Sequence, residues 1–228
     1  MTRNPILCAI DTPDLARARA LVATLAGTVA GVKLGLEFFA AHGPEGVLQV
    51  VGAQANAFLD LKLHDIPNTV AGAVRAALAL DPLFLTLHCA GGPAMLRAAV
   101  DSRGARRTKL LGVTVLTSLD DKDLAATGQT GPVEGQVRRL ALLAKAAGLD
   151  GVVCSSQEVA MLREACGAGF LLVVPGIRPA GAALGDQKRV QTPRAAIEAG
   201  ADYLVIGRPI TEASDPAAAA RAILSELP

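Results

Sequence analysis

Short apolar runs alternate with longer stretches of helical periodicity along nearly the whole chain. The apolar runs are rich in leucine or β-branched residues and span only a few positions, which is typical of strands buried on both faces. Turns with polar residues or glycine follow them. The pattern predicts strands over residues 6–10, 31–34, 57–62, 84–88, 111–116, 151–154, 171–174 and 203–206.

Alanine-rich segments with apolar residues at helical spacing lie between these strands. They predict helices over residues 14–25, 69–80, 93–102, 134–147, 157–165 and 193–199, with a closing helix over 216–227. Eight alternations of this kind favour an α/β fold of the (β/α)8 (TIM) barrel type, and a doubly wound open sheet is the alternative. No linker divides the chain, so we expect a single barrel domain over residues 1–228.

Composition narrows the possible partners of this domain. The chain has 228 residues, of which 51% are hydrophobic and 19% charged, and its formal net charge is +1. It has no Trp, a single Tyr and no block of Lys or Arg, so it lacks the charge and the stacking groups of a nucleic-acid binder. We therefore expect a small-molecule partner, or a second copy of the chain.

Two further sequence features concern compartment and metals. The first apolar run is too short for a signal peptide or a membrane span, so we expect no membrane association and a cytoplasmic protein. Four cysteines, Cys8, Cys89, Cys154 and Cys166, lie far apart without metal-binding spacing. This spacing predicts reduced, buried thiols, and no metal site is expected.

The predicted strand over residues 57–62 carries two opposite charges. Asp60 and Lys62 are two residues apart, and because strand side chains alternate, both should project to the same face. Leucines cover the other face of this strand. A surface ion pair is the structural alternative, but charges beside an apolar core need a compensating role.

Other polar residues follow the predicted strand ends, where the active sites of (β/α)8 barrels form. Gly207 and Arg208 have the character of an anion site, since a glycine allows close backbone approach and an arginine adds charge. Asp11 has a structural alternative as a helix N-cap, and Thr117 as a turn residue. We expect His88 to contact residues of the site rather than the substrate itself. The polar residues at or after these ends are Asp11, Lys33, Asp60, Lys62, His88, Thr117, Ser118, Arg178 and Arg208.

Several motifs occur in order from about residue 7 to residue 210. They are Asp11, Val32-Lys33, Asp60-x-Lys62-x-x-Asp65 with Ile-Pro-Asn-Thr69, Pro175-Gly-Ile-Arg178, Asp186-Gln187 and Ile206-Gly-Arg-Pro-Ile210. Together they resemble the orotidine 5′-phosphate decarboxylase family of the bacterial type. The resemblance implies a homodimeric (β/α)8 enzyme that converts orotidine 5′-monophosphate to UMP and CO2. This is the last step of de novo UMP synthesis, and in the family it needs no cofactor.

The resemblance also implies roles for individual residues. Lys62 is expected to donate a proton to C6 of the pyrimidine, within a charge array of Lys33, Asp60, Lys62 and Asp65. Active sites are expected to be shared across the dimer, with Asp65, Ile66 and Thr69 lying in the site of the partner subunit. The segment 180–187 is expected to act as a lid. The remaining implied substrate contacts are Asp11 and Lys33 to ribose, Asp60 near the departing carboxylate, Thr117 to the pyrimidine, Pro175, and Arg178, Gln187, Gly207 and Arg208 to phosphate.

Two other functions stay open at this point. One is a metal-dependent decarboxylase or aldolase of sugar phosphates on the same barrel, but Lys33 places a positive charge where an extra carboxylate would be needed to hold Mg2+. The other is a non-catalytic phosphosugar-binding barrel, which has no use for buried alternating charges. A Schiff-base aldolase using Lys62 is disfavoured, because the flanking carboxylates favour the protonated ammonium over the free amine.

Overall fold

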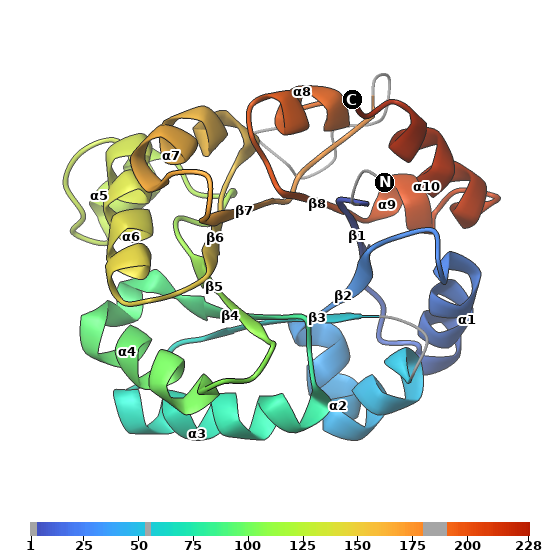
Figure 1. Ribbon diagram of the computed structural model, residues 1–228, viewed down its shortest axis with the longest axis horizontal. Coiled ribbons are helices and arrows are strands. Elements are labelled where there is room, and N and C mark those ends of the chain that lie inside the picture. Colours follow the sequence, from blue (N-terminus) through green and yellow to red (C-terminus); the bar gives the residue numbers. More distant parts are fainter. Residues whose placement is uncertain (1–3, 53–55, 180–190) are drawn as a thin grey trace.

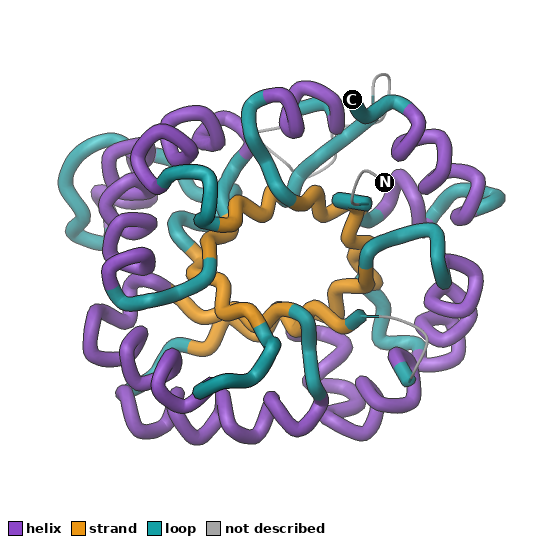
Figure 2. Tube along the Cα trace, viewed as in Figure 1, coloured by secondary structure: helices purple, strands orange, loops and turns teal. Residues whose placement is uncertain are grey.

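The computed structural model describes residues 4–52, 56–179 and 191–228. Within these residues the chain forms a closed barrel of eight parallel strands, paired in sequence order, with β8 returning to β1. Figure 1 shows the strands as an inner ring surrounded by helices, and Figure 2 separates the two layers by colour. The predicted (β/α)8 barrel is confirmed, and the open-sheet alternative is wrong.

All eight predicted strands are present. Seven of them match the predicted bounds to within one residue at each end, and β5 differs most, because it begins at Lys109 and ends at Val113 rather than spanning 111–116. Its pairing with β6 ends at Val113, since β6 has only three residues to offer. The strands are β1 (Ile6–Ile10), β2 (Gly31–Gly35), β3 (Ala57–Leu63), β4 (Phe84–His88), β5 (Lys109–Val113), β6 (Gly151–Val153), β7 (Leu171–Val174) and β8 (Tyr203–Ile206).

The helices form the outer layer, and each predicted helix is found with small shifts at its ends. Short 3-10 turns, Leu78–Leu80, Cys89–Gly91 and Ser156–Glu158, adjoin three of them. The α-helices are α1 (Leu15–Leu25), α2 (Leu36–Val51), α3 (Pro67–Ala77), α4 (Gly92–Arg103), α5 (Asp121–Ala126), α6 (Val133–Ala146), α7 (Val159–Cys166), α8 (Pro193–Glu198), α9 (Arg208–Thr211) and α10 (Pro216–Ser225).

Three of these helices, α2, α5 and α9, are not predicted from the sequence. In α2 the reason is visible in the backbone, because Gly43 has a φ of 59° and interrupts the helix before Pro44 starts it again. Glycine tolerates this conformation, and proline is favourable in a first helical turn. In the sequence, both residues therefore indicate the end of a helix, although α2 continues past them. The short helices α5 and α9 offer too few turns for periodicity to be detected.

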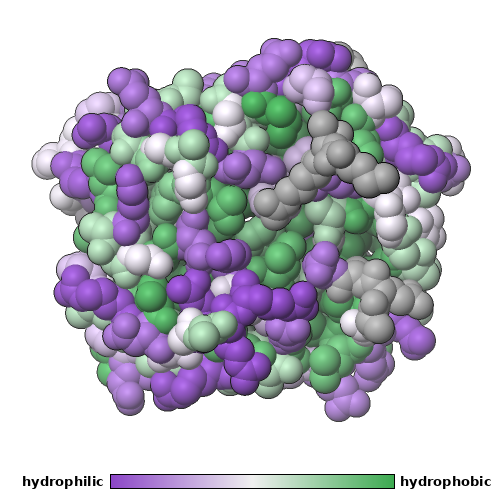
Figure 3. Space-filling model, viewed as in Figure 1, coloured by the Kyte–Doolittle hydropathy of each residue, from purple (hydrophilic) through white to green (hydrophobic). Residues whose placement is uncertain are grey.

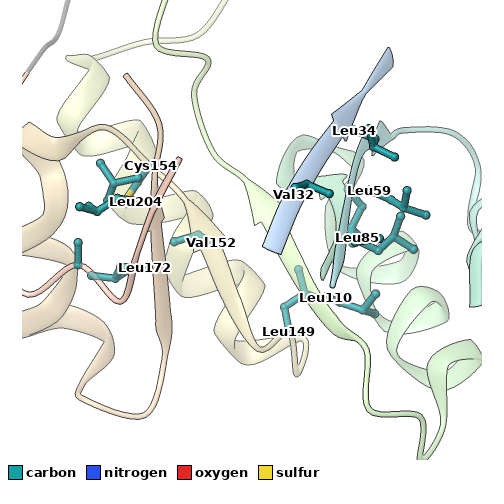
Figure 4. Packing of buried hydrophobic residues seen from close by; sticks show 14 of the residues in the cluster. Val32, Leu34, Leu59, Leu85, Leu110, Leu149, Val152, Cys154, Leu172 and Leu204 are labelled. Atoms are coloured by element: carbon teal, nitrogen blue, oxygen red, sulfur yellow. The ribbon is translucent and has the colours of Figure 1, made fainter. Parts of the chain in front are cut away.

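Two layers of apolar side chains fix where the polar site can form. Along β1, Ile6, Cys8 and Ile10 pack outward against the helices, whereas Leu7 and Ala9 point into the barrel. Figure 4 shows part of the outward layer, in which Leu59 and Leu85 lie side by side on neighbouring strands. The interior layer is small and fully packed. It consists of Leu7, Ala9, Phe58, Phe84, Leu111, Val173, Tyr203 and Val205.

This alternation also sets the direction of the charged side chains. On β3, Phe58 points into the barrel and Leu59 points out to the helices. Asp60 follows the inward side, directly above the interior apolar layer, as its place in the cavity lining confirms. The sequence prediction that Asp60 and Lys62 share a face opposite the leucines is confirmed, since Lys62 Nζ lies 2.8 Å from Asp60 Oδ2.

The remaining surface and thiol features agree with the composition. In the view of Figure 3, hydrophilic residues predominate around the periphery and hydrophobic residues show through toward the middle. Among the described helices, none combines the length and apolarity needed to cross a membrane. All four cysteines are free and buried, as predicted, and burial raises the pKa of Cys8 and of Cys89 to about 12.

Candidate active site

One cavity of about 530 Å3 opens where the carboxyl ends of the strands meet. Parallel strands deliver all their carboxyl ends to one rim, so residues far apart in sequence converge there. Residues from the ends of β1, β2, β3, β5, β6, β7 and β8 line it. Nine predicted site residues are among them: Asp11, Lys33, Asp60, Lys62, Thr117, Pro175, Arg178, Gly207 and Arg208.

Four of these residues form a continuous row of alternating charge. Lys33 Nζ lies 3.1 Å from Asp11 Oδ1 and 3.6 Å from Asp60 Oδ2. Lys62 Nζ approaches the same Asp60 oxygen to 2.8 Å. The row is mostly buried at its centre, because the side chains of Lys33 and Asp60 are 13% and 14% exposed, whereas that of Asp11 is 64% exposed. Charges this sheltered interact more strongly than surface pairs do.

Asp60 is ionised in this arrangement. Burial raises the pKa of its carboxyl, but the neighbouring ammoniums of Lys33 and Lys62 and the hydrogen bonds from Lys62 and Thr86 together lower it by more. The pKa of Asp60 therefore lies below its ordinary value, and the carboxylate keeps its negative charge at neutral pH. A fixed anion between two ammoniums is the main electrostatic feature of the cavity.

Two glycines leave room for this row. A side chain at Gly35 would begin 3.4 Å from Lys33 Nζ and 3.7 Å from Asp11 Oδ1. A side chain at Gly207 would begin 3.4 Å from Ala9 Cβ and 3.8 Å from Asp11 Oδ2. Any larger residue at either position would extend from there into space beside the charged groups.

Two arginines that follow β7 and β8 also line the cavity. Arg178 follows β7, is only 8% exposed, and donates from Nη1 to the carbonyl oxygen of Ile177 at 2.9 Å. Arg208 follows β8 and lines the same cavity together with Gly207. Two guanidinium groups beside a glycine-containing turn can bind an anionic group such as a phosphate.

Three predicted site residues do not line the cavity of their own chain. Asp65, Ile66 and Thr69 lie after β3 at the start of α3, and all three are exposed. Asp65 Oδ1 accepts a hydrogen bond from the backbone N–H of Ile66 at 2.7 Å, and no described residue forms an ion pair with it. The prediction that they complete the site of a partner subunit stays a prediction. Gln187, and the lid expected over 180–187, lie outside the described residues.

The structural alternative for Asp11 is wrong. The N-cap of α1 is Asp14, whose side chain accepts hydrogen bonds from the backbone N–H groups of Ala16 and Arg17. Asp11 instead pairs with Lys33 in the cavity. Asp14 can take over the cap because it directly precedes the first helical residue, Leu15, where a short acidic side chain reaches the free N–H groups.

Two groups near the charged row were missed at the sequence level. Thr86, on β4, is fully buried and its hydroxyl donates to Asp60 Oδ1 at 3.0 Å. Its partner is 26 positions away in the chain, so no local pattern could have indicated the contact. Glu212 lines the cavity just beyond the unpredicted helix α9. Finding α9 would have placed Glu212 beside Arg208, one helical turn apart.

His88 and His64 lie near the charged row but do not line the cavity. His88 ends β4, and its ring centre lies 5.5 Å from that of His64. Burial is the main reason why the pKa of His88 lies below its ordinary value, and the nearby His64 and Lys62 lower it further, against the opposing effect of Asp60. His88 is therefore neutral at neutral pH. Among the described residues, no three His, Cys, Asp or Glu side chains are grouped in a way that could hold a metal ion.

Comparison with known proteins agrees with this geometry. The family model described as "Orotidine 5'-phosphate decarboxylase / HUMPS family" matches residues 4–223. The orotidine 5′-phosphate decarboxylase of Rhodospirillum rubrum is 54% identical over 100% of this chain and 95% of its own. That of Thermobifida fusca is 55% identical over 98% of this chain and 95% of its own. A crystal structure of the Lactobacillus acidophilus enzyme of the same name is 39% identical, covers 98% of this chain and 99% of its own, and has a TM-score of 0.87.

The lowered pKa of His88 predicts a pH dependence of stability. The unfolded histidine binds a proton more readily than the folded one, so the free energy of unfolding should fall as the pH drops below about 6.5, the ordinary value. We expect His88→Gln to remove part of this fall. Urea unfolding at pH 7.5 and pH 5.5 measures it for both proteins. An equal fall in variant and wild type would show that His88 titrates normally in the folded state.

Proposed function

This chain belongs to the orotidine 5′-phosphate decarboxylase/HUMPS family, and we propose that it converts orotidine 5′-monophosphate to UMP and CO2, as a carboxy-lyase of pyrimidine biosynthesis. The observation that carries the proposal is the row of alternating charges from Asp11 to Lys62 on the wall of one cavity. The names of the curated relatives support the choice of substrate. We propose that the reaction needs no cofactor.

The chemistry explains why fixed charges are needed. Loss of CO2 from C6 of the pyrimidine breaks a carbon–carbon bond and leaves its electron pair on C6, in the plane of the ring. This pair cannot delocalise into the π system, as it could in a cofactor that acts as an electron sink. Stabilisation must therefore come from charges that are already in place before the reaction.

Lys62 is proposed to supply both stabilisation and a proton. Its ammonium offsets the negative charge that develops on C6 and then donates a proton to that carbon, so that CO2 is replaced by hydrogen. The amine left behind regains its proton from solvent. Asp60, 2.8 Å from Lys62 Nζ, keeps the ammonium oriented until the transfer.

Asp60 is also proposed to lie beside the carboxylate that departs. Two like charges in contact favour the departure of one of them as neutral CO2. Lys33 counters part of this repulsion from 3.6 Å. The array thus repels the substrate carboxylate and attracts the carbanion.

The rest of the cavity is proposed to hold the nucleotide. Arg178 and Arg208 with Gly207 bind the 5′-phosphate, Asp11 and Lys33 bind the ribose hydroxyls, and Thr117 contacts the pyrimidine, with Pro175 in the lining. Gln187 is proposed as a further phosphate contact on a lid over 180–187. Binding energy from the phosphate, remote from C6, can be used to organise the charged row.

We propose further that the enzyme is a cytoplasmic homodimer with shared sites. Asp65 carries its charge outside its own cavity, and the neighbouring Ile66 is 66% exposed, which is unusual for a large apolar side chain. Leu36, at the same carboxyl-terminal rim, is 56% exposed. A partner subunit would cover these groups and bring its Asp65, Ile66 and Thr69 to the row of charges.

Turnover in the presence of a chelator tests the proposed reaction. We expect the purified protein to consume orotidine 5′-monophosphate in excess EDTA, because the array provides the stabilising charge by itself. The fall in substrate absorbance and the formation of UMP measure it. Absence of turnover both with and without EDTA would contradict the proposal. Turnover that EDTA abolishes would favour a metal-dependent reaction on the same barrel.

Removal of the proposed proton donor should separate catalysis from binding. We expect Lys62→Ala to lose nearly all kcat while its dissociation constant for UMP changes by less than about tenfold, because the ammonium acts mainly in the transition state. Lys109→Ala is the matched control, since it removes a lysine that pairs with Asp150 at the other end of the barrel. Retained kcat in Lys62→Ala would contradict the role of Lys62.

Mixing two inactive variants tests the shared site. We expect Lys62→Ala and Asp65→Ala each to be nearly inactive alone. Refolded together in equal amounts, about half of the dimers are mixed, and one site of each mixed dimer combines an intact Lys62 with an intact Asp65. Activity should therefore return to about a quarter of the wild-type value. If mixed dimers form and nothing is restored, Asp65 acts within its own chain.

A further inference from the structure

The hydroxyl of Thr86 connects the backbone of Lys62 with the carboxylate of Asp60. The backbone N–H of Lys62 donates to Thr86 Oγ1 at 2.9 Å, and Thr86 Oγ1 donates to Asp60 Oδ1 at 3.0 Å. A hydroxyl carries one hydrogen and two lone pairs. A lone pair accepts from the N–H, and because the ionised carboxylate can only accept, the single hydrogen of the hydroxyl is directed at Asp60. The chain of donors thus runs from Lys62 through Thr86 to Asp60.

The backbone of β3 explains why a hydroxyl is needed here. Leu59 pairs with Leu85 and Leu63 pairs with Leu87, so three residues of β3 lie opposite the single Thr86 of β4. Lys62 has a φ of 49°, a conformation that residues other than glycine seldom adopt. A bulge of this kind takes backbone groups out of the regular ladder and redirects side chains. Thr86 Oγ1 replaces the ladder acceptor that the Lys62 N–H has lost.

The same bulge gives the two oxygens of Asp60 separate partners. Oδ1 accepts from Thr86, which leaves Oδ2 to the ammoniums of Lys62 at 2.8 Å and Lys33 at 3.6 Å. With Oδ1 held, the carboxylate cannot rotate without losing a hydrogen bond inside the protein. Thr86 is fully buried and is not among the residues that line the cavity. It therefore reaches a bound ligand only through Asp60 and Lys62.

We infer that Thr86 is a positioning residue for the decarboxylation, setting both the orientation of the Asp60 carboxylate and the bulged backbone that aims Lys62 at the substrate. This inference rests on the proposed function for its kinetic consequence. Its geometric content, that one hydroxyl holds both groups, is independent of which reaction the cavity performs.

Three variants separate positioning from packing. Thr86→Val keeps the shape of the side chain and loses the hydroxyl, whereas Thr86→Ser keeps the hydroxyl and loses a methyl group. Thr108→Val is the matched control, because Thr108 is also fully buried and its hydroxyl donates to the carbonyl oxygen of Pro82 at 2.7 Å, before β5 begins. Thermal unfolding of all three shows how much each loses in stability.

We expect Thr86→Val to lower kcat about 10- to 100-fold while the dissociation constant for UMP changes less than about threefold, since a hydrogen bond to a charged group is lost without loss of a ligand contact. Thr86→Ser should recover most of kcat, and Thr108→Val should keep it. Wild-type kcat in Thr86→Val, equal loss in Thr86→Ser, or a similar loss in Thr108→Val would each overturn the inference.

Crystal structures of wild type and Thr86→Val distinguish a failure of this inference from a failure of the proposed function. If the wild type does not decarboxylate orotidine 5′-monophosphate, the proposed function fails, and the geometry alone then decides about Thr86. We expect Lys62 to leave its positive φ, or Asp60 to rotate away from Lys62 Nζ, in Thr86→Val. An unchanged bulge and an unchanged Asp60–Lys62 distance would show that the hydroxyl positions neither group.

Discussion

A single carboxylate oxygen, Asp60 Oδ2, holds both ammoniums of the site. A carboxylate this buried is unfavourable unless cations compensate it, and two lysines drawn together are unfavourable unless an anion separates them. Each member of the row therefore requires the others, and the barrel must keep all of them on the same side of its apolar interior. The parallel pairing of the strands and the bulge in β3 place these groups together on that side.

The cavity combines a nearly neutral row with an excess of positive charge. Asp11 and Asp60 balance Lys33 and Lys62, and the lining also holds Arg178 and Arg208 with one further carboxylate, Glu212. A ligand with one strongly anionic end would thus be oriented before any contact with the row is made.

The barrel could be predicted from the sequence because strands and helices each leave a pattern over a few neighbouring residues. Apolar runs mark the strands, and the two-residue spacing of Asp60 and Lys62 fixes their common face. Contacts across strands carry no local signal, which is why Thr86 was missed although it holds Asp60. Gly43 and Pro44 concealed α2, because a kinked helix breaks the periodicity on which such predictions depend. Asp65 lies outside the cavity of its own chain, and its proposed place in the site of a partner is a property of assembly, which the fold of one chain does not determine.

The packed interior layer also decides how molecules can move through this protein. Phe58, Phe84 and Tyr203 meet edge to face across the barrel, with ring centres 5.0 to 5.6 Å apart, and fill it below the charged row. The barrel is consequently filled in its interior and hollow only at the carboxyl ends of its strands. Among the described residues, the interior is closed below the cavity, so a ligand enters and leaves at the carboxyl ends of the strands, and a product that stays bound there excludes the next substrate.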